Sequence, residues 1–215
     1  MKHPSQTLIS PQTRASLRPR LHQADRGVGV SFIEGVLNLG LCLEQDGQLY
    51  DVDQAQLDAW GQTVEDLLPA AIDNLRRHTS VEELIHVDTT PGMYFYLAQN
   101  NLVAERLLLA SELFANWPMG GLLACVPDNQ QLLLVPLHAI AAVEILDVLV
   151  NSAQYLAGSS EDPLSNQVFW TDGGEWEHLH VCTTSGSIDL FPPENFLRAI
   201  ERLAAMQLVP KVAEA

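Results

Sequence analysis

Two segments near the middle of the chain, residues 122–126 and 132–135, carry apolar side chains on both alternating faces. A strand with one face in water alternates apolar and polar residues, so this pattern predicts two strands in the interior of a sheet. Asp128, Asn129 and Gln130 separate the two segments, and such side chains tolerate turn geometry and bond back to the backbone. The stretch is therefore interpreted as a buried hairpin and not as a place of catalysis.

The remaining pattern of apolar and polar residues predicts alternating hairpins and helices. Asp46 and Gly47 between apolar runs indicate a hairpin turn. Gly61 suits the end of a short helix, and Thr63 suits the start of a second one. The other expected elements are strands at 83–88 and 92–98, a helix at 101–115, a helix at 138–158 that ends at Gly158, three strands within 167–191 and a helix at 193–208.

Two of the expected helices have little polar surface. The helix at 101–115 has four residues on its polar side, among them Glu105 and Arg106, so most of its surface should be covered. The helix at 138–158 has a narrow polar stripe, which predicts burial in the core or against a second copy in a homodimer. Together these elements predict an α+β fold, a mixed, largely antiparallel sheet of hairpins with helices packed against it as a layer sandwich.

The composition indicates a core that needs neither disulfides nor a structural metal, because 47% of the 215 residues are apolar. The longest apolar run, residues 132–156, is interrupted by charged and polar residues, so no membrane span is expected. The N-terminus has no secretory signal pattern. Cys42, Cys125 and Cys182 are odd in number and far apart, which predicts reduced thiols in a cytoplasmic protein.

The formal net charge of −16 is unevenly distributed along the chain. Residues 1–26 carry five basic side chains and one acidic one, and they include several prolines. We expect them to form a flexible basic segment ahead of a single α+β domain at 27–215.

The domain, in contrast, is strongly acidic, with nine carboxylates and no Lys or Arg between Gly27 and Leu75. Such a surface repels nucleic acid and anionic membranes and attracts basic proteins. A basic protein is therefore the expected partner, although acidity can also serve solubility alone. The residues assigned to this partner contact are Glu44, Asp46, Asp51, Asp53 and Asp58.

The middle of the chain contains "LYDVDQAQLDAWGQTVEDLLPAAIDNL" and then "MYFYLAQNNLVAERLLLASELFANWPMGGLLACVPDNQQLLLVP". The succession of a short acidic strand, a helix ending in Asn-Leu, a Tyr-Phe-Tyr-Leu strand, an "AERLLL" helix and an aliphatic hairpin resembles the YtpQ-like family of uncharacterised bacterial proteins (domain of unknown function 1444). The resemblance covers about residues 40–160, and residues 1–40 do not match. It implies the fold and a bacterial, cytoplasmic origin, and it carries over no catalytic residues.

The segment "EWEHLHVC" is the best candidate for chemistry. Strand alternation places Trp176, His178, His180 and Cys182 on one face. Imidazole and thiolate groups are zinc ligands, so His178, His180 and Cys182 form a candidate metal site. The histidine and cysteine four residues apart are about 13 Å from each other on a strand, so further ligands would have to come from elsewhere. The alternative is that the histidines are ordinary polar residues of a half-exposed strand and that no cofactor is bound.

The sequence identifies no catalytic residues. A cysteine nucleophile would be Cys125 or Cys182 with a distant histidine, and no local signature supports such a pair. No spacing typical of a phosphate-binding glycine loop occurs. We therefore expect a non-catalytic acidic module for protein-protein interaction, such as an adaptor, a chaperone-like protein or an inhibitor or immunity-type protein. The alternative is a small metal-dependent hydrolase that uses the strand face of His178, His180 and Cys182.

Overall fold

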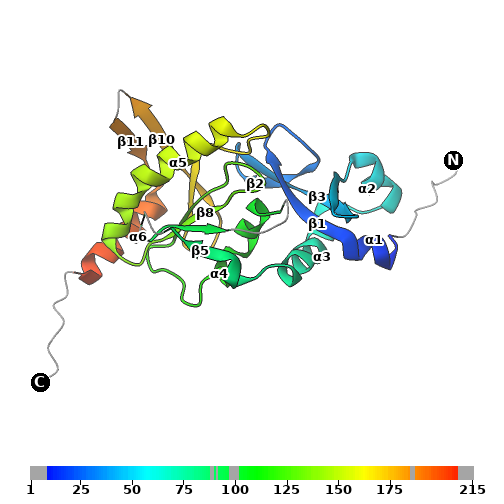
Figure 1. Cartoon of the computed structure of the whole chain (residues 1–215), viewed down its shortest axis with the longest axis horizontal. Helices are drawn as coiled ribbons and strands as arrows, with labels where there is room; N and C mark the ends of the chain where they lie inside the picture. Colours follow the sequence, from blue (N-terminus) through cyan, green and yellow to red (C-terminus); the bar gives the residue numbers. More distant parts are fainter. Residues whose placement is uncertain (1–8, 88–89, 91, 97–101, 185–186, 208–215) are drawn as a thin grey trace, which may run out of the picture.

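The chain folds into two antiparallel sheets with helices packed against them (Figure 1). This computed structural model describes residues 9–87, 90, 92–96, 102–184 and 187–207. The combination of hairpins and covering helices confirms the predicted α+β class. The helices are α1 (Pro11–Ser16), α2 (Gln54–Trp60), α3 (Val64–Arg77), α4 (Ala110–Leu113), α5 (Leu146–Ser159) and α6 (Glu194–Gln207), and the 3-10 helices are η1 (Val81–Glu83), η2 (Ala104–Leu109) and η3 (Ile140–Ile145).

The smaller sheet, sheet A, is built around its third strand. β1 and β2 flank β3, and β4 also pairs with β3. The predicted turn between β3 and β4 is confirmed, because Asp46 (φ 52°) and Gly47 (φ 76°) both have the positive φ of a two-residue hairpin turn. The strands of sheet A are β1 (Leu17–Gln23), β2 (Gly29–Ile33), β3 (Leu37–Gln45) and β4 (Gln48–Asp51).

The larger sheet, sheet B, has the strand order β11-β10-β9-β7-β8-β6-β5. The two segments predicted as inner strands are β7 and β8, which pair with each other and are buried at every residue. Asp128 lies in the connection between them, where its Oδ1 accepts a hydrogen bond from the N–H of Gln130 (2.8 Å). The predicted buried hairpin is therefore confirmed. The strands are β5 (Leu84–His86), β6 (Tyr94–Tyr96), β7 (Leu122–Cys125), β8 (Leu133–Pro136), β9 (Val168–Thr171), β10 (Glu177–Thr184) and β11 (Ser187–Phe191).

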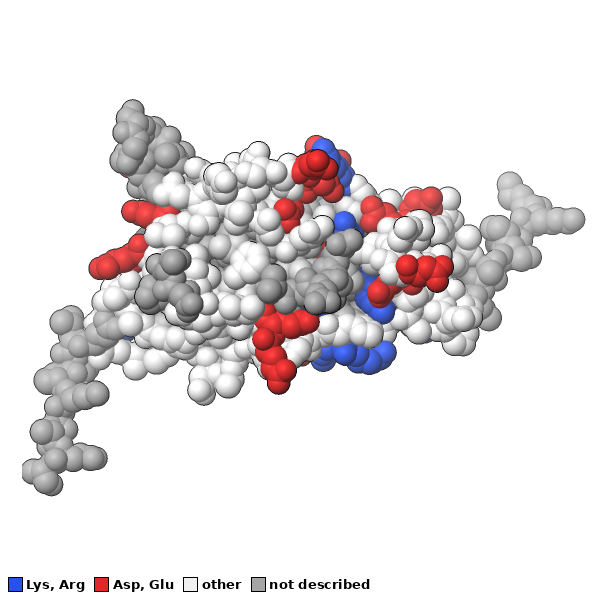
Figure 2. Space-filling model, in the orientation of Figure 1, with Lys and Arg blue, Asp and Glu red and all other residues white. Residues whose placement is uncertain are grey.

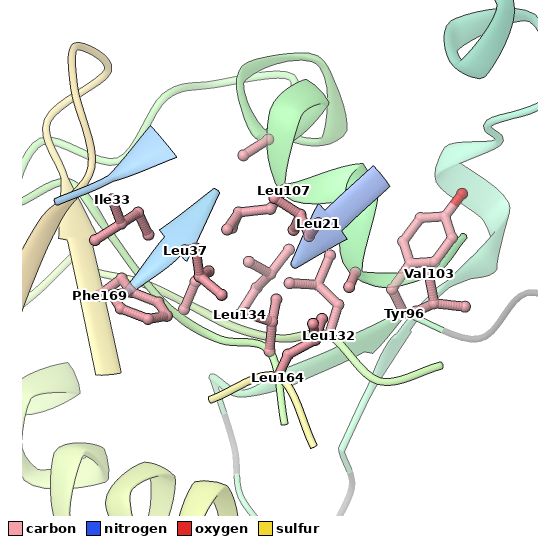
Figure 3. Packing of buried hydrophobic residues seen from close by; sticks show 14 of the residues in the cluster. Leu21, Ile33, Leu37, Tyr96, Val103, Leu107, Leu132, Leu134, Leu164 and Phe169 are labelled. Atoms are coloured by element: carbon pink, nitrogen blue, oxygen red, sulfur yellow. The ribbon is translucent and has the colours of Figure 1, made fainter. Parts of the chain in front are cut away.

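The main core lies between the two sheets (Figure 3). Leu21 and Leu37 of sheet A pack with Leu134 and Phe169 of sheet B, and Leu107 of η2 joins them. All five are almost completely buried. Burying one such side chain contributes about 1.5 to 3 kcal/mol, so this cluster is a major source of the free energy of folding.

The opposite face of sheet B is covered by α5 and α6. Leu149 of α5 and Phe196 of α6 belong to the same buried cluster as Trp170 and Leu179 of the sheet. By length and composition, Ile140–Ser159 is a helical stretch apolar enough to cross a membrane. Here its inner side packs on the sheet, and the expectations of no membrane contact and of a possible homodimer stay predictions.

The expectation of a flexible segment at residues 1–26 is wrong for the described part. Leu17–Gln23 form β1, which pairs with β3 along its whole length. Leu17 and Leu21 alternate with Arg18 and Arg20 and are fully buried. The alternation of a half-buried strand is thus present, but the prolines and the positive charge obscured it. β1 is the last strand in the order of sheet A, a position that tolerates a proline such as Pro19.

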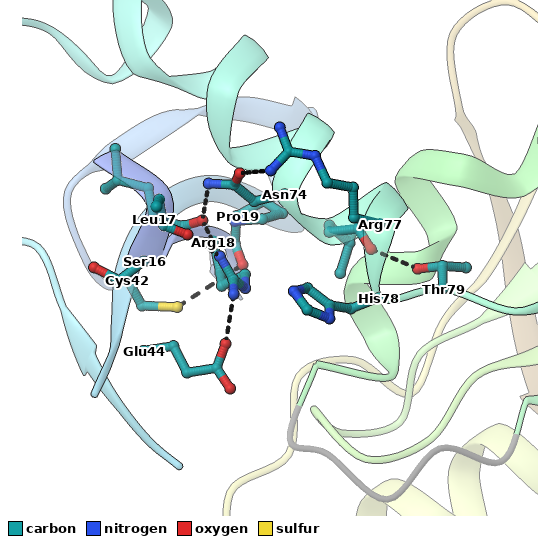
Figure 4. Close-up of polar contacts among 12 residues, drawn as sticks. Ser16, Leu17, Arg18, Pro19, Cys42, Glu44, Asn74, Arg77, His78 and Thr79 are labelled. Carbon is teal, nitrogen blue, oxygen red and sulfur yellow. Dashed lines mark hydrogen bonds and ion pairs between the residues drawn. The ribbon is translucent and has the colours of Figure 1, made fainter. Parts of the chain in front are cut away.

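Asn74 of α3 holds the chain where α1 meets β1 (Figure 4). Its side-chain amide donates to the backbone oxygens of Arg14 (2.9 Å) and Leu17 (3.0 Å). Its Oδ1 accepts from Nη1 of Arg77 (2.9 Å). Asn74 is 4% exposed, so its amide ties α3 to the junction of α1 and β1 from within the core, where Leu17 also accepts from Nη1 of Arg18 (2.8 Å).

Two expected helix boundaries are wrong. The helix expected at 101–115 is a 3-10 helix, η2, followed by the single turn α4. The helix expected to end at Gly158 continues to Ser159, and Ser160 adopts the extended conformation that ends it. Gly158 keeps helical geometry, so no left-handed residue marks this end.

The polar side expected on the 101–115 helix is in fact buried. Glu105 and Arg106 are both 0% exposed. Oε1 of Glu105 accepts from the N–H of Leu21 (3.0 Å) and lies 3.8 Å from Nη1 of Arg20. Burial raises the pKa of Glu105 to about 7, although the charge of Arg20 opposes this rise. Arg106 lies over the ring of Tyr96 with its guanidinium carbon 5.5 Å from the ring centre. Both side chains therefore hold η2 against its neighbours.

We expect Asn74→Asp to lower the free energy of unfolding by about 1 to 3 kcal/mol, because a buried carboxylate cannot donate the two hydrogen bonds that the amide makes to Arg14 and Leu17. Chemical denaturation measures this loss. Asp73→Asn, at an exposed position of the same helix, should change the stability by less than about 0.5 kcal/mol. Equal effects of the two substitutions would show that the amide does not hold β1.

We expect Glu105→Gln to remove one component of the pH dependence of stability. The pKa of Glu105 in the folded state, about 7, lies above its ordinary value of 4.5, so the folded state binds the proton more tightly than the unfolded state. The resulting stabilisation is complete below pH 4.5 and is lost as the pH rises through about 7. The stability of the variant relative to wild type should increase by up to about 3 kcal/mol over this range.

Denaturation curves at several pH values test this prediction, with Glu201→Gln at an exposed position as the matched control. The difference between the control and the wild type should be independent of pH. A pH-independent difference for Glu105→Gln as well would contradict the role given to its burial.

Candidate functional site

A cleft of about 1080 Å³ lies between the end of β2 and the start of β10. One wall comes from residues 31–34 of sheet A, and the other comes from residues 174–180. Phe191, at the end of β11, lies at its border together with Pro192 and Pro193. The cleft thus forms where sheet A ends and the outer strands of sheet B continue beyond it.

The side chains that line this cleft are of three chemical kinds. Some are aromatic, some are carboxylates and some are imidazoles, and among the described lining residues there is no lysine or arginine. The aromatic group consists of Phe32, Trp176 and Phe191, the carboxylates are Glu34, Glu175 and Glu177, and the imidazoles are His178 and His180.

His178 and His180 lie on one face of β10, as the alternation predicted. Leu179 between them is fully buried in the cluster with α5 and α6 on the opposite face. The centres of the two imidazole rings are 4.1 Å apart. Nε2 of His178 lies 2.8 Å from Oε1 of Gln167, and because an amide oxygen only accepts, this nitrogen donates.

The environment favours a neutral His178. Burial lowers the pKa of its imidazole, and the neighbouring His180 lowers it further. Protonation of the second ring would place two positive charges side by side. His178 also lines a second hollow of about 590 Å³ on its other side, together with Gln167 and Gln154.

The candidate metal site is only partly assembled in the described residues. His178 and His180 come together, whereas the side chain of Cys182 lies outside what the structure describes. Within the described part of the chain, no group of three or more His, Cys, Asp and Glu side chains is arranged to hold a metal ion. Structural zinc sites use four ligands, so two imidazoles alone do not make one. Zinc binding stays a prediction.

The acidic residues assigned to a partner lie around the β3–β4 hairpin and α2, but several of them have local roles. Oε2 of Glu44 is 2.8 Å from Nη2 of Arg18 (Figure 4), and Oδ1 of Asp53 caps α2. Asp58 accepts from Gln54. The other two are exposed, Asp46 in the hairpin turn and Asp51 at 4.0 Å from Nε2 of His22.

Figure 2 shows acidic side chains at this end of the molecule, with a largely uncharged surface over α5. Basic side chains lie beside them, because β1 of the basic segment pairs with β3, and Arg18 of β1 is ion-paired with Glu44.

The described cysteines do not form a nucleophilic site. Cys42 and Cys125 are both fully buried. Burial raises the pKa of Cys42 to about 12 and raises that of Cys125 well above its usual range. The thiolate is the nucleophile, so both groups are unreactive at neutral pH. His138, which follows β8, is exposed to solvent.

Phe32, Glu34 and Phe191 were not identified from the sequence. The turn after β2, with Gly35 at φ 70°, carries Glu34 to the cleft. No local motif marks these residues. Phe32 and Glu34 approach His178 only when sheet A packs on sheet B, and Phe191 reaches the histidine pair through the pairing of β11 with β10, where it lies opposite His180.

Comparison with protein families, curated proteins and solved structures finds no match for this chain. The resemblance to the YtpQ-like family therefore stays an expectation.

We expect the imidazole of His178 to titrate with a midpoint below 6.5, because burial and His180 both oppose its protonation. Nuclear magnetic resonance of the ring signals measures this midpoint. His180→Gln should raise it part of the way toward 6.5, since only the smaller of the two causes is removed. A midpoint above 6.5 in the wild type would contradict this environment.

The same ring signals test the metal alternative. Addition of zinc should leave both imidazoles unchanged if two ligands are insufficient. Stoichiometric shifts of His178 and His180 together would instead support the zinc site.

Proposed function

We propose that this protein is a non-catalytic interaction module whose acidic surface binds a basic protein partner. The observation that carries the proposal is that basic side chains already pair with carboxylates of the same chain, while the carboxylates far outnumber the basic residues. Arg18, Arg26, Arg76 and Arg198 each lie within 4 Å of a carboxylate of the same chain. The chain has 27 acidic residues against 11 basic ones, so a large excess of carboxylates is left for an external partner.

The site chemistry favours this proposal over the metal-dependent hydrolase. The two described thiols are buried, and the histidine pair has no third ligand within the described residues. Buried free thiols also suit a reducing compartment, which supports a cytoplasmic location. An adaptor, a chaperone-like protein and an inhibitor or immunity-type protein are all compatible with such a surface.

Retrieval from a native lysate on immobilised protein tests the proposal. At about 50 mM salt we expect one basic protein to dominate, and at about 500 mM salt we expect most of it to be released, because salt screens surface charge. An unrelated protein of similar net charge serves as the control. The proposal fails if nothing is retained beyond the control, or if retention is the same at both salt concentrations.

A further inference from the structure

We propose that the cleft between β2 and β10 is the place where an arginine-bearing segment of the basic partner docks. This inference rests on the proposed function and adds to it the binding site and the kind of side chain that is recognised. The site combines a hollow, carboxylates from two separate parts of the fold and aromatic rings.

The volume of the cleft suits a stretch of polypeptide. At about 1080 Å³ it lies at the upper limit of small-molecule pockets, which have about 300 to 1,000 Å³. Its walls combine residues of β2, β10 and β11 with the turns beside these strands, so both sheets anchor them.

The charge of the cleft selects a cation. Glu34 lines the cleft from the β2 side, and Glu175 lines it just before the start of β10, where Glu177 follows. The Oε1 of Glu177 accepts from Nδ2 of Asn195 of α6 (2.8 Å), on the face of β10 opposite to His178, so Glu34 and Glu175 are the carboxylates that a ligand in the cleft would meet. A cation in this cleft therefore meets carboxylates on both sides.

The aromatic side chains favour arginine over lysine. Trp176 is half-buried and packs against the main core, so its ring is fixed. Phe32 and Phe191 line the same cleft. A guanidinium group stacks on aromatic faces while its N–H groups donate to carboxylates, whereas an ammonium group is a compact, strongly hydrated charge.

The test measures the binding of a blocked tetra-arginine peptide and of its tetra-lysine counterpart by calorimetry. The cleft variant is Glu34→Gln with Glu175→Gln, and the matched control is Glu161→Gln with Glu201→Gln. All four glutamates are exposed, and both double variants lose the same charge, so a difference between them reports on location alone. Trp176→Leu tests the aromatic contribution, and melting curves verify that each variant folds.

We expect the wild type to bind the arginine peptide several-fold more tightly than the lysine peptide. The cleft variant should bind the arginine peptide about tenfold more weakly, and the control less than about twofold. Trp176→Leu should remove the preference for arginine. An equal loss in both double variants overturns the cleft as the site but leaves the acidic surface as a binding surface. Equal binding of the two peptides by the wild type overturns arginine recognition, and binding of neither peptide overturns both the cleft and the proposed function.

Discussion

The architecture depends on one constraint, which is that β7 and β8 are apolar on both faces and must be shielded from water on both. A single layer of helices covers only one face of such a sheet. The second face is covered by another sheet, whose leucines pack on Leu134 and Phe169, while α5 and α6 cover the first. The layered order of the molecule follows from this requirement.

The same constraint produces the cleft. Sheet A covers the inner strands of sheet B but ends near Ile33, whereas β10 and β11 continue outward. Because sheet A is shorter than sheet B, the cleft remains beside the end of sheet A. It is lined by polar side chains of β10 that point away from the core. His178 and His180 reach solvent there because Leu179 between them satisfies the hydrophobic face.

Features that depend on local sequence signals were predicted, whereas features that depend on contacts between distant parts of the chain were missed. The β7–β8 hairpin and the capped helices α2 and α3 were predicted, because alternation, Gly61 and Thr63 are local signals. The strand β1 was missed, since its alternation is short and contains a proline. The burial of Glu105 was also missed, because it depends on the N–H of Leu21, a group far away in the sequence. For the cleft, strand alternation identified the imidazoles and Trp176, while the wall that carries Glu34 exists only in the packed structure.

The position of His178 gives the two hollows a common boundary. His178 lines both the large cleft and the hollow with Gln154, and its Nε2 is bonded to Oε1 of Gln167, which lines the hollow. A rotation of this one side chain would break that bond and change the shape of both spaces at once. The shape of both spaces therefore depends on the orientation of a single imidazole.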